Sequence, residues 1–185
     1  MDRANFGRAA LSAGAGAVGA ILLYAFLHVF GPIELEGGNL MNTSPEENRH
    51  LWIRLLTTQL LPYLAVLGIS GALVARAFGM TWQRAIVSSL VAYAAATAVA
   101  TVVSLALDLL VTVRETQFGS LILVFTTSVV LLLALRRAPT MLLVVAAFIA
   151  AVTFLLAPML GGYVGLVSWV ILPPVAALTT PEQRN

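Results

Sequence analysis

A small set of polar side chains interrupts an otherwise apolar chain, and their types allow them to bind a solute. They are His28, Arg54, Gln59, Asp108 and Arg114. An arginine guanidinium can grip a carboxylate or phosphate through two parallel hydrogen bonds. An aspartate within a spanning helix costs about 2.5–3.5 kcal/mol at the membrane centre, so it is expected to have a polar partner. Together these residues indicate a pocket for a small polar or anionic solute.

An ion pair that joins two helices is the alternative explanation for the same residues. Asp108 could pair with Arg54 or with Arg114, and the other polar side chains would then be hydrated at the membrane surface. Both interpretations put the polar group on the same side of the membrane. The sequence leaves both open.

Cofactor and metal chemistry have little support in the sequence. His28 and His50 could ligate one b-type haem near the outer surface, but neither lies in the middle of an apolar run, so we expect no cofactor. The chain has no cysteine, which removes thiolate nucleophiles and iron–sulfur ligation. We expect no metal site, because the spacing of the clustered acids fits no metal-binding loop. These acids are Glu34, Glu36, Glu46 and Glu47.

The elements that position these side chains are long apolar runs. The chain is 60% hydrophobic and 10% charged, which excludes a water-facing fold. A helix needs about 20 apolar residues to cross roughly 30 Å of hydrocarbon. We therefore predict an all-α, polytopic integral membrane protein with six transmembrane helices in one domain. The predicted helices cover residues 9–30, 55–78, 85–113, 119–135, 140–157 and 161–178.

The arginines between these runs predict the orientation of the protein. All 10 basic residues are arginine, and basic residues in short loops stay on the cytoplasmic side. Arg49, Arg54 and Arg114 fall on one side of the predicted zigzag. We therefore expect both termini in the cytoplasm, in the plasma (inner) membrane of a prokaryote. The opposite, cytoplasmic side carries Arg3, Arg8, Arg76, Arg84, Arg136, Arg137 and Arg184.

One long loop is predicted on the outer side, next to the polar group. It covers residues 31–50 and could act as a cover for a solute pocket. Ser44 followed by Pro45, with Glu47 three residues after the serine, predicts a helix start near residue 45. A later proline, Pro62, is expected to kink the helix that follows.

Small residues repeat at helical spacing in the first and third runs. Such residues let helix backbones approach closely in lipid, so they predict packing within the chain or docking on a partner protein. In the third run they are Ala92, Ala96 and Ala100. In the first run they are Ala9, Ser12, Ala13, Gly16, Ala17 and Ala20.

A short motif in the second run has the form of a protease signature. Gly68, Ser70 and Gly71 match the G-x-S-G pattern of rhomboid proteases, in which the serine attacks a peptide bond with a histidine as base. No histidine follows His50 in this chain, so that base is missing. We therefore predict tight helix packing at these residues, and no enzyme activity.

In size and layout the chain is similar to the substrate-binding S components of energy-coupling-factor transporters. The similarity lies in its length, its six predicted helices and the Ala9, Ala13, Ala17 spacing of its first helix, and it carries over no binding residue. It implies a transport role. We therefore predict a non-enzymatic, transport-related multi-pass subunit whose outward polar group binds a solute. The alternative is a structural or assembly subunit of a bioenergetic or secretion complex.

The partners follow from the same features. We expect contact with the lipid bilayer and with other membrane protein subunits, and a small polar solute if the pocket exists. A net charge of +2 without a basic cluster argues against nucleic acid.

Overall fold

The computed structural model describes residues 3–30, 49, 53, 56–109, 111–135 and 139–179, and this part of the chain contains helices and no strand. The all-helical prediction is therefore confirmed for the described residues. Two short turns of helix precede α3 and α7: a π-helical turn, η1 (Leu56–Leu60), and a 3-10 turn, η2 (Gly162–Leu166). The α-helices are α1 (Arg3–Phe30), α3 (Leu61–Ala77), α4 (Trp82–Asp108), α5 (Glu115–Leu135), α6 (Thr140–Leu160) and α7 (Val167–Thr179).

Five helical segments are long and apolar enough to cross a membrane, which fits a multi-pass membrane protein. The remaining helix, α3, is apolar but has 17 residues, or about 26 Å at 1.5 Å per residue. Pro62, the predicted kink, lies in its first turn, directly after η1. The five spans are Phe6–Val29, Trp82–Asp108, Thr116–Leu135, Thr140–Leu160 and Gly162–Thr179.

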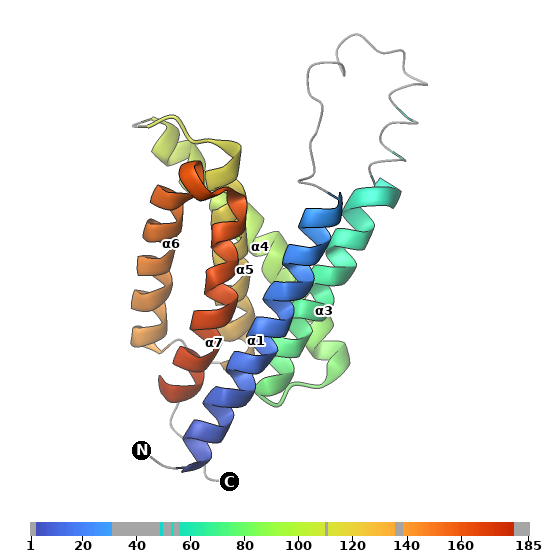
Figure 1. Ribbon diagram of the computed structural model, residues 1–185, viewed down its shortest axis with the longest axis vertical. Coiled ribbons are helices and arrows are strands. Elements are labelled where there is room, and N and C mark those ends of the chain that lie inside the picture. Colours follow the sequence, from blue (N-terminus) through green and yellow to red (C-terminus); the bar gives the residue numbers. More distant parts are fainter. Residues whose placement is uncertain are drawn as a thin grey trace.

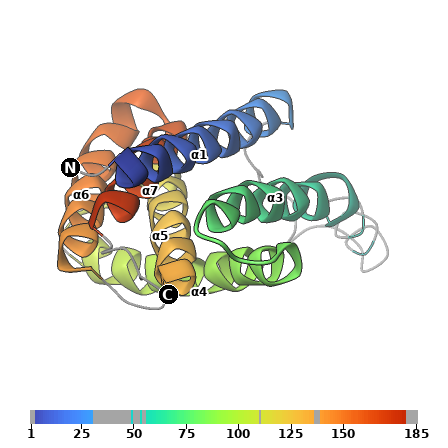
Figure 2. The ribbon, with the colours of Figure 1, turned by 90° about the horizontal axis from the view of Figure 1, so that it is seen from below.

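Successive helices run in alternating directions along the bundle (Figure 1). Arg3 of α1 and Thr179 of α7 therefore lie at the same end, which we call the lower end, and η2 lies at the upper end. Seen from below, α5 occupies the middle, with the other helices around it (Figure 2). It contacts α3, α4, α6, η2 and α7. Half of the residues in its most apolar stretch, 50%, are buried, against 17% in α4, which makes α5 the central helix.

The third predicted helix is shorter than expected. It ends at Asp108 and not at residue 113, so Asp108 is the last residue of this apolar helix and does not lie five residues inside it. The Asp108 side chain is exposed, and its Oδ1 accepts a hydrogen bond from the backbone N–H of Val113 at 2.9 Å. An aspartate that binds nearby backbone in this way favours a turn over continued helix.

Helix α1 lies between α7 and α3, and glycines permit both contacts. A Cβ on Gly16 would overlap the carbonyl oxygen of Trp169, and one on Gly19 would come within 3.3 Å of Ser70 Cβ. Ser12, Gly16 and Ala20 are buried, as is Ala9, whereas Ala13 and Ala17 are half-buried. The small residues of α1 thus serve close packing within this chain.

Two further helix contacts also depend on a glycine that leaves no room for a Cβ. A Cβ on Gly71 of α3 would lie 2.7 Å from Ser89 Cβ of α4, and one on Gly165 of η2 would lie 2.6 Å from the Ser120 carbonyl oxygen of α5. Ala92, Ala96 and Ala100 are buried on the same helix as Ser89. The G-x-S-G motif of α3 therefore lies in a packing contact, as predicted for these residues.

Gly16→Ala is expected to lower the free energy of unfolding by about 1–3 kcal/mol, because its methyl group would push α1 away from α7. The matched control is Gly14→Ala in the same helix, where a Cβ meets no atom within 4 Å. That variant should stay within about 1 kcal/mol of the wild type or gain stability from helix propensity. Unfolding by SDS titration in mixed micelles measures both, and equal effects would contradict the close α1–α7 approach.

Candidate functional site

Asp108 and Arg114 lie at the two ends of the turn between α4 and α5, and both are exposed. Asp108 caps the backbone of Val113, and the backbone N–H of Arg114 donates to Gln117 Oε1 at 2.8 Å. Within the described part of the chain, Asp108 and Arg114 form no ion pair with each other. The turn is closed by side-chain to backbone hydrogen bonds instead.

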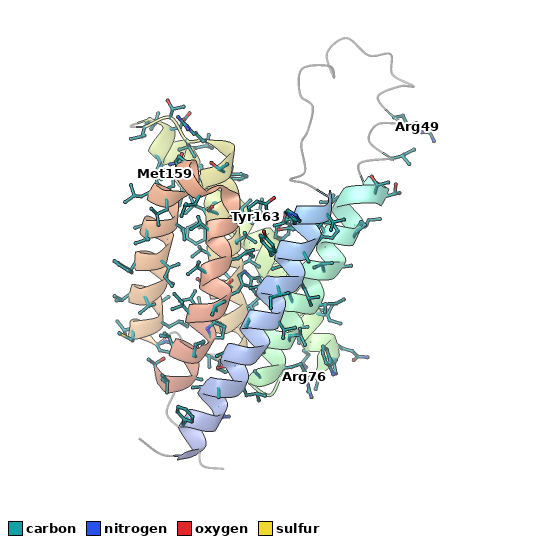
Figure 3. All side chains as sticks on the ribbon, in the orientation of Figure 1. Arg49, Arg76, Met159 and Tyr163 are labelled. Atoms are coloured by element: carbon teal, nitrogen blue, oxygen red, sulfur yellow. The ribbon has the colours of Figure 1, made fainter. Side chains whose placement is uncertain are left out.

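His28 belongs to an aromatic cluster at the upper end of α1. Its ring is exposed and stacks on Tyr24, with centroids 5.7 Å apart, and Tyr24 meets the edge of Tyr163 at 5.6 Å. The Tyr163 hydroxyl donates to the carbonyl oxygen of Leu27 at 3.4 Å. Figure 3 shows Tyr163 reaching the upper half of α1 from η2. Aromatic rings at this level are typical of a membrane interface, and here they tie α1 to η2.

The structure separates His28 from Asp108 and Arg114. The upper end of α1 and the end of α4 lie on opposite sides of the bundle in Figure 2, and Figure 1 agrees. Two other members of the predicted group, Arg54 and the Gln59 side chain, lie outside the described residues. So do His50 and residues 31–48 of the predicted cover. Of the three predicted ligands whose side chains are described, the structure thus brings Asp108 and Arg114 to one short turn and keeps His28 apart.

Sequence reasoning missed a line of buried polar side chains on α5, which we call the α5 seam: Gln117, Ser120 and Thr127. Ser120 Oγ donates to the Gly162 carbonyl oxygen at 3.0 Å, and Thr127 and Ser168 share a hydrogen bond at 3.1 Å. Gln117 Nε2 donates to the Phe154 carbonyl oxygen at 3.1 Å. The α5 seam therefore joins α5 to α6, η2 and α7 in turn.

A proline explains why Gln117 is needed. Pro158 lies inside α6 and has no N–H, so it cannot bond to the carbonyl four residues earlier, which belongs to Phe154. Within the apolar part of a membrane, such a carbonyl has to find its donor in the protein. Gln117 supplies it from α5. A proline inside an apolar helix, together with a glutamine on another helix, is the sequence signal that could have found this pair.

Pro173 creates a similar situation in α7. It leaves the Trp169 carbonyl oxygen without its helical donor, and Gly16 of α1 packs directly against that oxygen. The Gly16 hydrogen that stands in place of a Cβ points at the oxygen, which is the geometry of a Cα–H hydrogen bond between helices. The α1–α7 contact thus also occupies a carbonyl freed by proline.

Three buried polar atoms in the described part of the chain have no hydrogen-bond partner. They are Ser70 Oγ, Ser104 Oγ and Trp169 Nε1, on three different helices. Ser70 and Trp169 both lie against Gly19. These two side chains therefore pack between α1, α3 and α7 without a side-chain hydrogen bond, in contrast to the side chains of the α5 seam.

Among the described residues, no three His, Asp or Glu side chains gather closely enough to hold a metal ion. No protein-family model matches the chain, and no curated protein or solved structure matches it either. Its function is therefore inferred from its own residues.

The pairing of Gln117 with the carbonyl freed by Pro158 can be tested by a double-mutant cycle. Gln117→Leu should lower the free energy of unfolding by about 1 kcal/mol, the scale of side-chain hydrogen bonds in membrane proteins. In a Pro158→Ala background the part of this cost that comes from the Phe154 carbonyl should vanish, because residue 158 then supplies the N–H, while the loss of the bond from the Arg114 N–H to Gln117 Oε1 should remain. SDS titration of the four proteins measures the coupling. Gln83→Leu, an exposed glutamine on α4, is the control, and additive effects of the two changes would rule out the pairing.

Proposed function

We propose that this chain is a non-enzymatic, multi-pass subunit of a membrane protein complex. It spans the plasma membrane of a prokaryote six times, with both termini in the cytoplasm. Five spans have the required length, and α3 with its 17 residues lies at the lower limit of about 17–25 residues for a spanning helix. The π-helical turn η1 precedes α3 without a break and extends it.

The distribution of arginines supports the proposed orientation. Arg8, Arg76 and Arg84 lie at the lower end of the bundle, together with the first residues of α1 and the last residues of α7. Arg114 lies at the upper end. Positive charge is retained on the cytoplasmic side during insertion, so the lower end is the cytoplasmic end in this proposal.

The observation that carries the subunit role is how the chain uses its buried polar groups. Gln117, Ser120 and Thr127 all bond to neighbouring helices, so the polar side chains of the α5 seam hold the bundle together. The three predicted solute ligands whose side chains the structure describes, by contrast, are split between the His28 cluster and the turn that contains Asp108 and Arg114. This arrangement favours a structural or assembly role over an autonomous solute pocket.

Exposed alanines in the middle of α4 support assembly through this helix. The α6 face presents large side chains such as Phe148 and Leu155, which suit contact with lipid tails. The α4 face presents Ala94, Ala95 and Ala98 between larger exposed side chains such as Val91 and Val102, and these alanines permit close approach of another spanning helix at that point. The partner in this proposal is therefore a spanning helix of another membrane protein, seated on α4.

The six-span orientation can be tested with single cysteines, because the natural chain has none. Gln83→Cys at the start of α4 should react with a membrane-impermeant maleimide only after the cells are permeabilised. Thr112→Cys, exposed in the α4–α5 turn, should react in intact cells. The cysteine-free parent is the control. The reverse labelling pattern would show that the topology is inverted. Labelling of both sites in intact cells would contradict the proposal that α4 spans the membrane.

The assembly role can be tested with matched tryptophan substitutions. Ala98→Trp on α4 should abolish a stoichiometric membrane protein partner seen after purification in mild detergent from native membranes. Ala147→Trp, at an exposed alanine of α6, should keep that partner. Native mass spectrometry reads the complex, and thermal unfolding shows that both variants fold. A lone chain in every sample, or equal behaviour of the two variants, would refute assembly through α4.

The second candidate is a solute-binding transport subunit, and one observation favours it. His28, Asp108 and Arg114 all lie exposed at the upper end, which faces outward in the proposed orientation. The same mass spectra separate the two functions. A bound polar metabolite that disappears in Asp108→Ala or Arg114→Ala, with no protein partner present, would establish the transport role in place of assembly.

A further inference from the structure

The turn between α3 and α4 holds an arginine in a fixed position at the lower end of the bundle. Arg76 Nη1 donates to the Met80 carbonyl oxygen at 2.7 Å. Arg76 Cζ lies 5.6 Å from the centre of the Trp82 ring, within the range of a cation–π contact. Gly79, at φ 87°, turns the chain so that its N–H bonds back to the Arg76 carbonyl oxygen at 2.9 Å. The guanidinium is therefore held by a carbonyl and by a ring.

The fixed guanidinium keeps most of its hydrogen-bonding capacity. It carries five N–H donors, and the bond to Met80 uses one of them. The edge formed by Nη2 and Nε still presents two parallel N–H groups, which match two oxygens of a phosphate. Arg76 is exposed and Trp82 is 50% exposed, so a ligand can reach this edge from the surrounding membrane. Because the side chain is already ordered, binding costs little further entropy.

The position of this pair along the bundle indicates which phosphate it meets. Figure 3 shows Arg76 at the lower end, beyond most of the apolar side chains. A half-exposed tryptophan at the end of a spanning helix is typical of the headgroup level of a bilayer. The acidic residues within the described part of the chain, Asp108 and Glu115, belong to the opposite end. Exposed Arg8 and Arg84 add positive charge at the lower end, which attracts anionic lipid.

We propose that Arg76 and Trp82 form a binding site for the phosphate group of an anionic phospholipid. The guanidinium fork binds the phosphate oxygens, and the indole lies against the lipid's glycerol and upper acyl chain. The site rests on the part of the proposed function that embeds the chain in a bilayer, but it requires neither a partner protein nor a given orientation. It anchors the α3–α4 turn at the headgroup level.

The test measures lipid preference of the full chain. The protein is equilibrated in micelles with equimolar phosphatidylglycerol and phosphatidylcholine, and the lipid it retains is counted by mass spectrometry. The wild type should prefer phosphatidylglycerol. Arg76→Ala should lower this preference about ten-fold, the loss expected for a charge-assisted hydrogen-bond pair. Arg76→Lys should lower this preference by a smaller factor, because lysine keeps the positive charge and loses the two parallel N–H groups.

Arg84→Ala is the matched control, since it removes an exposed arginine from the same end. In roughly 1 M salt the screening length falls to about 3 Å, so diffuse attraction is suppressed. The wild type and Arg84→Ala should then retain equal preference, and Arg76→Ala should have none. Equal losses in the two alanine variants would overturn the site, because the arginines would then act only as diffuse charge.

Two further measurements keep the outcome unambiguous. Inorganic phosphate is added as competitor, and if it displaces the lipid at low concentration, the site serves a soluble anion and the lipid assignment is wrong. If Arg76→Ala fails to fold, Trp82→Leu replaces it, with an expected several-fold loss of preference, and an unchanged preference would contradict the proposal. Failure of the lipid site would leave the cysteine-labelling pattern unchanged, whereas failure of the membrane topology would alter that pattern.

Discussion

The bundle depends on one constraint: in a membrane, every backbone carbonyl must find its donor within the protein. Prolines inside α6 and α7 remove such donors, and the positions of α5 and α1 compensate for two of them. Gln117 reaches the carbonyl oxygen of Phe154 from α5, and Gly16 brings α1 against the carbonyl oxygen of Trp169. The contact of α5 with α6 and the close α1–α7 approach both meet this requirement.

The same constraint bears on function. A side chain whose hydrogen bonds are made to a neighbouring helix is not available to a solute, and Gln117, Ser120 and Thr127 are all used in this way, the first two on backbone carbonyls and Thr127 on the Ser168 hydroxyl. The exposed charges lie instead at the two ends of the bundle, where water or lipid headgroups meet them. The described part of the chain thus divides into an interior joined by the α5 seam and two polar ends. This is the reason for looking for partners on its surface and at its ends.

Local features of the sequence were sufficient for a large part of this description. Apolar runs long enough to cross a membrane predicted the helices, because helix length and hydropathy are properties of a continuous segment. Spacing by four predicted that Ala92, Ala96 and Ala100 share one face of a helix, and all three are buried. The end of α4 was misjudged, since hydropathy does not reveal that Asp108 caps the following turn.

The sequence by itself determined the helical class, the apolar lengths and the uneven distribution of arginines. Only the tertiary structure decided which residues meet. It placed His28 beside Tyr163 and away from Asp108, and it paired Gln117 with a carbonyl on another helix. The physical reason is that helix formation depends on neighbours within a few residues. Contacts between helices depend instead on where two helices cross. Glycines and prolines on segments far apart in the sequence together decide that position.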